Sequence, residues 1–157
     1  MSESDIVIAD DNPANLKLLE DMLLQRAYEV RSFPLGRLAL AAAMRNPPDL
    51  ILLDINMPEM DGYQVCERLK SIQGLSDIPV IFSSALNETK DKARAFRSGA
   101  VDYIPKPFQF EEVDARVETH LRLHDLQGAL KLANEGQKKL SRAKEDFMAD
   151  MRASILL

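Results

Sequence analysis

Cysteine and tryptophan are nearly missing from this sequence of 157 residues, which has one cysteine and no tryptophan. The single cysteine, Cys66, cannot form a disulfide within the chain, and such cysteine usage favours a reducing compartment. Long apolar runs are missing too, since no segment approaches the roughly 20 apolar residues that a membrane-spanning helix needs. The first residues, Met1 to Asp5, lack the basic and apolar stretches of a signal peptide. We therefore expect a cytoplasmic protein without a membrane segment.

An excess of positive charge is also missing, because the formal net charge is -5. Binding to nucleic acid needs clustered lysine and arginine, so we expect no nucleic-acid surface in this chain. Hydrophobic residues make up 46% and charged residues 29%, as in ordinary globular proteins. The length is enough for one domain with a core and an appendage, but not for two full domains.

Short apolar runs alternate with longer segments of helical period up to about residue 124, which predicts a parallel sheet covered by helices on both faces. The central run, Leu50–Leu53, is apolar at every position, as expected for a strand buried on both sides. The runs that we interpret as strands are Ile6–Ala9, Glu29–Phe33, Leu50–Leu53, Pro79–Phe82 and Val101–Ile104.

Start and stop residues mark several helices between these strands. Asn12 is a good N-cap, and Pro13 suits the first helical position. The inner face of this helix is predicted to carry Leu16, Leu19, Leu23 and Ala27. A further helix is expected after Gly62, and another over about residues 87–98, ending at Gly99.

From Phe110 onward no helix breaker interrupts the pattern. Apolar residues recur in spacings of three and four, which is typical of a coiled-coil seam, at Leu123, Leu126, Leu130, Ala133, Gln137, Leu140, Lys144, Phe147 and Met151. The seam is imperfect because Gln137 and Lys144 are polar and because Gly128 and Gly136 weaken a helix. A single amphipathic helix that folds back on the domain, or frays, stays an open alternative. We expect a domain over residues 1–124 and a helical arm over residues 125–157.

Polar side chains stand at or just beyond the expected ends of four strands. They are Asp10 and Asp11 after the first strand, Asp54 and Asn56 after the third, Ser84 after the fourth and Lys106 after the fifth. The carboxyl ends of parallel strands converge on one crevice, where ligands of open α/β sheets usually bind. Each residue has an ordinary alternative explanation, such as a helix cap, a solvated strand end or a surface lysine. Taken together, these residues indicate a functional site.

Three neighbouring carboxylates repel one another unless a cation compensates their charge. Mg²⁺ is the natural cation, because it binds one or two carboxylates and keeps waters and a phosphate oxygen. A carboxylate beside such a metal can attack a phosphoryl group and form an acyl phosphate. Phosphoryl transfer mainly needs positioning and neutralisation of charge, which Mg²⁺, Lys106 and Ser84 would supply.

Four segments resemble the receiver domains of response regulators in their order and spacing. They are Asp10–Pro13, Leu53–Gly62, Ser84–Ala85 and Asp102–Phe108, and the resemblance covers about residues 5 to 124. It implies a flavodoxin-like (βα)5 fold, a doubly wound parallel sheet of strand order 2-1-3-4-5, here with a long C-terminal helix. The strand order is taken from the family.

The resemblance also implies the roles of the site residues in a two-component system or phosphorelay. Asp54 would accept a phosphoryl group from a sensor histidine kinase or a phosphotransfer protein, while Ser84 and Lys106 contact the phosphoryl oxygens. Mg²⁺ would be held by Asp10, Asp11, Asp54 and Asn56, Asp10 acting through water and Asn56 through its backbone carbonyl. Ser84 and Tyr103 would then move and change the surface of the fourth helix, fifth strand and fifth helix. A cis bond between Lys106 and Pro107 is implied as well.

The arm would act as a dimerisation helix that transmits this change, and the chain would be a homodimer. The arm would also link the receiver to an output domain that this sequence lacks. Two alternatives stay open. A phosphatase of the haloacid dehalogenase type also forms an aspartyl phosphate on Mg²⁺, but it needs an acid where Asn56 stands. The other alternative is a coiled-coil scaffold whose acidic site is not phosphorylated. His120 and His124 have a spacing that can bind metal, but without a third ligand we interpret them as partly exposed helix residues.

Overall fold

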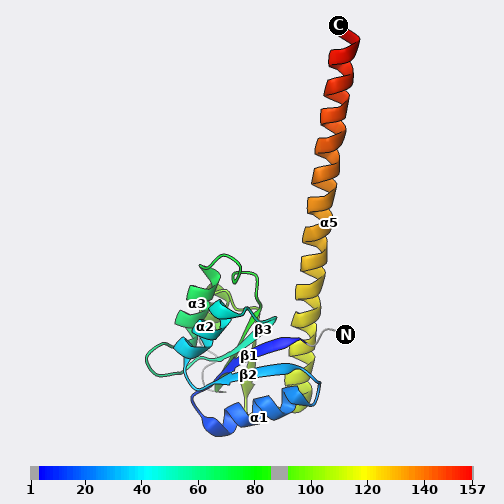
Figure 1. The fold of residues 1–157 in the computed structure, drawn as a ribbon. Helices are drawn as coiled ribbons and strands as arrows, with labels where there is room; N and C mark the ends of the chain where they lie inside the picture. Colours follow the sequence, from blue (N-terminus) through cyan, green and yellow to red (C-terminus); the bar gives the residue numbers. More distant parts are fainter. Residues whose placement is uncertain (1–3, 86–91, 157) are drawn as a thin grey trace. The chain divides into compact units, whose positions relative to one another are not determined.

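The computed structural model describes residues 4–85 and 92–156 of the chain, and it describes side chains for residues 4–85 and 93–136. The expected helix at 87–98 therefore lies partly outside the described residues. The helices and strands alternate regularly along the chain (Figure 1). Their bounds are β1 Asp5–Ala9, α1 Pro13–Leu24, β2 Glu29–Phe33, α2 Gly36–Arg45, β3 Leu50–Asp54, α3 Gly62–Lys70, β4 Val80–Ala85, α4 Lys92–Arg97, β5 Asp102–Lys106 and α5 Phe110–Leu156.

The strands form one five-stranded sheet of order β2-β1-β3-β4-β5. Every neighbouring pair is parallel, with β1 paired to both β2 and β3. The order changes direction at β1, so the loops after β1 and β3 open on the same crevice, which is where such sheets bind ligands. The predicted doubly wound, flavodoxin-like fold with a long C-terminal helix is confirmed.

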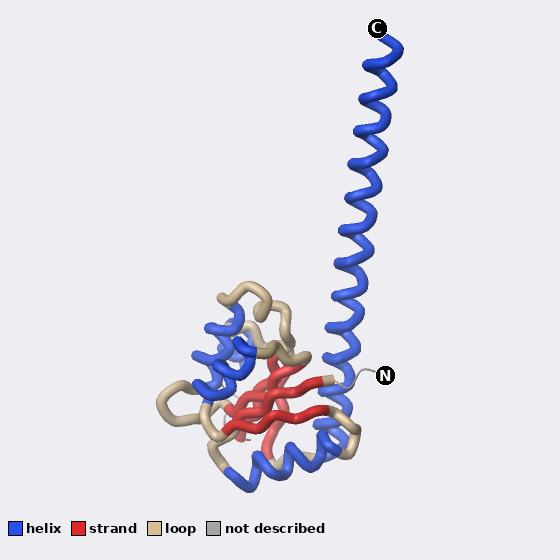
Figure 2. The backbone as a smooth tube through the Cα atoms, viewed as in Figure 1, coloured by secondary structure: helices blue, strands red, loops and turns tan. Residues whose placement is uncertain are grey.

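Helices cover both faces of the sheet (Figure 2). An apolar cluster lies between the sheet and the helices on each face. Helices α1 and α5 pack on one face, where Leu19 and Leu23 of α1 meet Val113 and Val117 of α5. Helices α2, α3 and α4 cover the other face, where the buried thiol of Cys66 belongs to the core. Because both faces are covered, β3 is buried at all of its positions, as the apolar run at residues 50–53 predicts.

The start of helix α1 agrees with its sequence signals, but its end does not. The Asn12 side chain accepts hydrogen bonds from the backbone N–H groups of Ala14 and Asn15, at 2.9 and 3.2 Å. The helix ends at Leu24, so Ala27 lies in the following turn with φ 61° and is exposed. The prediction that Ala27 lies on the inner face was wrong, because the helix ends at Leu24 and Ala27 itself has a left-handed conformation.

Replacing Ala27 by glycine is expected to raise the free energy of unfolding by about 1 kcal/mol, because only glycine adopts this left-handed conformation without a steric cost. Ala41 provides the control, since it is exposed inside α2 and its replacement by glycine should cost about 1 kcal/mol. Urea denaturation of both variants measures the two effects. A destabilised Ala27→Gly variant would contradict the explanation.

Three strands extend further than their apolar runs indicate. Asp54 is the last residue of β3, Ser84 lies inside β4, and Lys106 is the last residue of β5. In the sheet, Asp54 pairs with Ser83 and Ala85 pairs with Lys106. Asp54, Ser84 and Lys106 therefore stand on the strands themselves, and the sheet holds their backbone in place.

The chain divides into two compact units, residues 1–124 and 125–157, and helix α5 contributes to both. In the first unit, Val117 and Leu121 of α5 are buried against the sheet. Between Leu123 and residue 136, the last residue whose side chain is described, the apolar side chains are exposed, at 48% for Leu123, 56% for Leu126 and 64% for Leu130. Across the described part of the chain, no helix is both long and apolar enough to cross a membrane.

Candidate functional site

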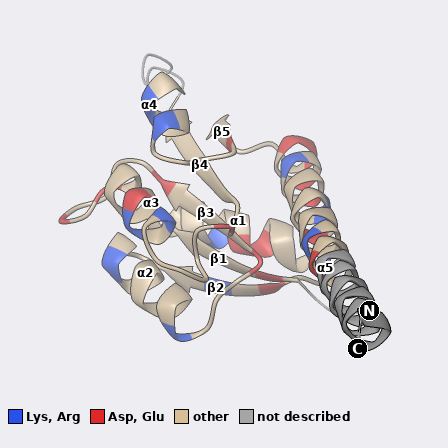
Figure 3. Ribbon diagram, turned by 90° about the horizontal axis from the view of Figure 1, so that it is seen from above, with Lys and Arg blue, Asp and Glu red and all other residues tan. Residues whose placement is uncertain are grey.

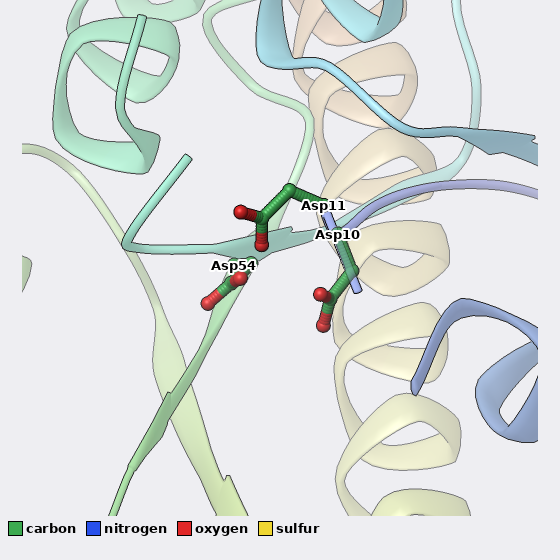
Figure 4. A group of neighbouring side chains, drawn as sticks. All are labelled: Asp10, Asp11 and Asp54. Atoms are coloured by element: carbon green, nitrogen blue, oxygen red, sulfur yellow. The ribbon is translucent and has the colours of Figure 1, made fainter. Parts of the chain in front are cut away.

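Three carboxylates meet at the carboxyl ends of β1 and β3 (Figure 4). Asp10, Asp11 and Asp54 each offer an oxygen, and these oxygens all lie within 4.8 Å of one another. Asp10 is fully buried, Asp54 is 4% exposed and Asp11 faces solvent. Among the described residues, no other group of three or more acidic, histidine or cysteine side chains is arranged closely enough to hold a metal ion. The pair His120 and His124 therefore forms no such site with a described neighbour.

Lys106 brings the one ammonium group of this site from the end of β5. Its Nζ donates to Asp54 Oδ1 at 3.0 Å and lies 3.4 Å from Asp10 Oδ2. Asp10 Oδ1 accepts a hydrogen bond from the backbone N–H of Asn12 at 2.9 Å. Asp10 Oδ2, by contrast, is buried without a hydrogen-bond partner, since its contact with Lys106 is an ion pair at longer range. The group thus has one lysine for three carboxylates, and Lys106 contacts two of them.

Burial and the neighbouring charges shift the pKa values of Asp54 and Lys106. Burial, and then repulsion by Asp10, raises the pKa of Asp54 to about 7 despite the contact with Lys106. Burial alone would lower the pKa of Lys106, but the ion pairs with Asp54 and Asp10 raise it overall. The lysine stays charged at neutral pH, whereas Asp54 would titrate there in the absence of a cation.

The residues present fit a bound Mg²⁺ ion. They offer closely spaced oxygen donors at the ends of β1 and β3, and Asp10 Oδ2 is a buried oxygen that lacks a hydrogen-bond donor. Hard cations such as Mg²⁺ bind carboxylate and carbonyl oxygens. A divalent cation would also remove the repulsion that raises the pKa of Asp54.

The loop after β3 is held against the site by close backbone packing. A Cβ atom on Gly62 would lie 2.4 Å from the carbonyl oxygen of Asp54, so only glycine allows α3 to begin here. The Gly62 N–H donates to Ile55 O at 2.8 Å. Asp61 and Gln64 cap the start of α3 reciprocally, at 2.9 and 3.0 Å. Sequence analysis missed this capping box, although the spacing of an N-cap acid and a glutamine three residues later indicates it.

The remaining predicted residues lie in the loop after β3 and on β4 and β5. Asn56 is exposed in the loop two residues after Asp54. Ser84 is 8% exposed and pairs in register with Pro105, next to Lys106. Tyr103 is half-buried on β5 and packs against the core on the side of α2 and α3. The bond between Lys106 and Pro107 is cis, as the resemblance implies.

The sequence matches the family model described as the response regulator receiver domain over residues 6–118. A DNA-binding dual master transcriptional regulator, RpaA of Synechocystis sp., is 42% identical over 120 residues. These residues are 76% of this chain but 50% of RpaA. The chain thus spans about half of this relative, and between 26% and 51% of the other curated relatives that it matches well.

Solved structures agree with the sequence matches. The signal receiver domain of a signal transduction histidine kinase from Syntrophus aciditrophicus is 34% identical with a TM-score of 0.70, over 76% of this chain and 90% of that one. The receiver domain of a sensor histidine kinase from Pseudomonas aeruginosa PAO1 has a magnesium ion in its active site cleft. It is 28% identical with a TM-score of 0.71, over 76% of this chain and 98% of that one. The chain therefore belongs to the response regulator receiver domain family.

Proposed function

We propose that Asp54 accepts a phosphoryl group from the phosphohistidine of a sensor histidine kinase or a phosphotransfer protein, with Mg²⁺ bound at Asp10, Asp11, Asp54 and the backbone carbonyl of Asn56. The cluster of three carboxylates with Lys106 carries this proposal. Family membership supports it, because receiver domains are signalling modules. The proposal places the chain in the cytoplasm, in keeping with its free cysteine.

In the proposed reaction an oxygen of Asp54 attacks phosphorus, the P–N bond of the phosphohistidine breaks, and the imidazole of the donor keeps the electron pair. The bound cation would offset the negative charge of the phosphoryl oxygens. Lys106 already touches Asp54 Oδ1, so its ammonium group is in place for an oxygen of the phosphoryl group. The Ser84 hydroxyl would bind another phosphoryl oxygen from the end of β4.

The proposal includes a switch that starts at this site. Movement of Ser84 toward the phosphoryl group would leave space into which Tyr103 turns, and the surface of α4, β5 and α5 would change. Helix α4 carries Arg94 and Arg97 in its last turn (Figure 3), and the Arg94 guanidinium lies over the ring of Tyr63 in α3. The bulky side chains of Phe96 and Val101 are exposed beside them, at 53% and 39%.

We further propose that residues 1–124 are the receiver and that residues 125–157 pair with a second copy as a coiled coil that leads to an output domain. The exposed row of Leu123, Leu126 and Leu130 supports this pairing, because its spacing of three and four residues fits a coiled-coil seam. The greater length of the relatives supports a further domain.

Incubation with acetyl phosphate and Mg²⁺ should add one phosphoryl group to the chain, and intact-mass measurement detects it. The Asp54→Asn variant should stay unmodified, because an amide cannot form an acyl phosphate. Asp61→Asn is the control, since Asp61 caps α3 outside the carboxylate cluster. Modification of the Asp54→Asn variant, or steady hydrolysis of ordinary phosphomonoesters, would contradict the proposal.

Removal of the arm after His124 should leave a folded monomer, because the contacts divide the chain at this residue. The full chain should associate, since a row of leucines exposed along one helix gains by burial in a dimer. Light scattering over a concentration series compares the two. A full chain that is as monomeric as the truncated one would argue against pairing through the arm.

A further inference from the structure

Asp102 connects strand β5 to helix α5 through a set of contacts outside the acidic site. Its side chain is 18% exposed. Asp102 Oδ1 accepts from Arg116 Nη1 at 2.7 Å and from the backbone N–H of Tyr103 at 2.8 Å. Asp102 Oδ2 lies 3.0 Å from His120 Nε2. A carboxylate can only accept, so a proton on His120 Nε2 completes this contact.

The two partners on α5 are one helical turn apart, so they hold one face of the helix to the edge strand. The His120 side chain is 14% exposed, and Arg116 is also fixed by Glu112 at 3.2 Å. Burial alone would raise the pKa of Asp102, but the hydrogen bonds from His120, Arg116 and the backbone of Tyr103 lower it. The carboxylate is therefore ionised whenever the chain is folded at neutral pH.

Arg116 also lies over the ring of Tyr103, the residue that follows Asp102. Its guanidinium carbon lies 5.9 Å from the centroid of the Tyr103 ring. A guanidinium over an aromatic face is attracted by it, and Arg116 is thus shared between the Asp102 carboxylate and Tyr103. Any turn of the Tyr103 ring toward the site must change the surroundings of Arg116, and with them the contacts that Asp102 makes to α5.

We propose that Asp102, Arg116 and His120 form a latch that ties Tyr103 to α5, so that a change of Tyr103 alters the turn of the helix that carries Arg116 and His120. This inference rests on the proposed function, because it takes the change of Tyr103 from phosphorylation of Asp54. The latch is specific to one side of the helix. On the side of α1, Arg26 binds Asp114 at 2.5 Å and Glu118 at 3.6 Å, and neither contact involves Tyr103.

The two histidines of the chain provide the probe. Nuclear magnetic resonance of the imidazole rings follows His120 in the latch, while His124, one turn further on, serves as an internal control. Addition of Mg²⁺ and beryllofluoride, which mimics the phosphoryl group, should shift the ring signals of His120 more than those of His124. The same addition to the Asp54→Asn variant should shift neither.

Two further variants separate the latch from a general effect on the helix. Asp102→Asn removes a charge that faces Tyr103 and should reduce the beryllofluoride-induced shift of His120 about fivefold. Asp114→Asn removes a charge that faces Arg26 of α1 and should leave that shift unchanged. If Asp102→Asn does not fold, Arg116→Gln tests the same contact and should give the same reduction.

The outcomes distinguish the inference from the proposed function. If beryllofluoride shifts backbone signals around Asp54 while His120 does not respond, the latch is disproved and the proposed function stands. Equal responses of His120 in the Asp102→Asn and Asp114→Asn variants overturn the latch as well. If no signal near Asp54 responds, the proposed function fails and the latch fails with it.

Discussion

Without divalent cations, the free energy of unfolding is expected to fall by on the order of 4 kcal/mol as the pH rises from about 4 to about 7. The cause is Asp54, whose pKa is raised from 3.8 to about 7 by burial and by the neighbouring Asp10. In this pH range the folded chain keeps a proton on Asp54 that the unfolded chain has already lost. Folding therefore binds a proton, and stability decreases with rising pH until both states are ionised.

Urea denaturation at several pH values, with a chelator present, measures this dependence. The Asp54→Asn variant cannot ionise at this position, so most of the slope should disappear and the variant should be more stable than the wild type at pH 8. Asp21→Asn is a matched control, because Asp21 forms an exposed ion pair with Lys17 and should leave the slope intact. Equal slopes for the wild type and the Asp54→Asn variant would show that burial and Asp10 do not raise the pKa of Asp54 as described.

Mg²⁺ should restore the stability that the folded chain loses when Asp54 ionises. A cation that binds only the folded chain stabilises it by about 2.7 kcal/mol at a concentration one hundred times its Kd. At pH 8 the gain should be large for the wild type and much smaller for the Asp54→Asn variant, which has lost one carboxylate of the cluster.

Replacement of Gly62 by alanine is the second change with a large expected effect. The added Cβ would lie 2.4 Å from the carbonyl oxygen of Asp54 and 3.0 Å from Ile55 Cα, and neither backbone atom can move without disturbing β3. We expect a loss of about 3 kcal/mol in the free energy of unfolding, together with weaker Mg²⁺ binding, because the strand end that carries Asp54 must shift.

Gly128→Ala is the control for this substitution, since no atom lies within 4 Å of its added Cβ and the helix should gain stability. Thermal unfolding of both variants, with and without Mg²⁺, provides the comparison. A Gly62→Ala variant that is as stable as the wild type and binds Mg²⁺ equally well would show that the loop after β3 is not held as the structure indicates.

The alternation of strands and helices and the acidic cluster could be predicted because both follow from local patterns, whereas the strand order came from the resemblance to the receiver family. An apolar run that ends in an acid places that acid at the crevice, and this reasoning put Asp10, Asp11, Asp54 and Lys106 at one edge of the sheet, where they are found. The strand ends were harder to predict. Ser84 and Lys106 look polar in the sequence, yet the backbone of both pairs within the sheet, so β4 and β5 run further than their apolar runs.

Contacts between distant segments could not be predicted in this way. Asp102, Arg116 and His120 carry no local signal, since charged residues on an edge strand and a helix usually face solvent. Ala27 was misplaced because a helical period alone does not show where a left-handed residue ends the helix. Helix α2 was given no bounds from sequence, although Ala39, Leu40 and Ala43 form its buried face at helical spacing.

A crystal structure of the chain with Mg²⁺ and beryllofluoride tests the central claim most directly. We expect beryllium bonded to an Asp54 oxygen, Lys106 Nζ within hydrogen-bond distance of a fluorine, and the metal ion bound by oxygens of Asp11, Asp54 and Asn56. Beryllofluoride bound elsewhere, or a metal ion bound away from the three carboxylates, would contradict the assignment of Asp54 as the phosphoryl acceptor.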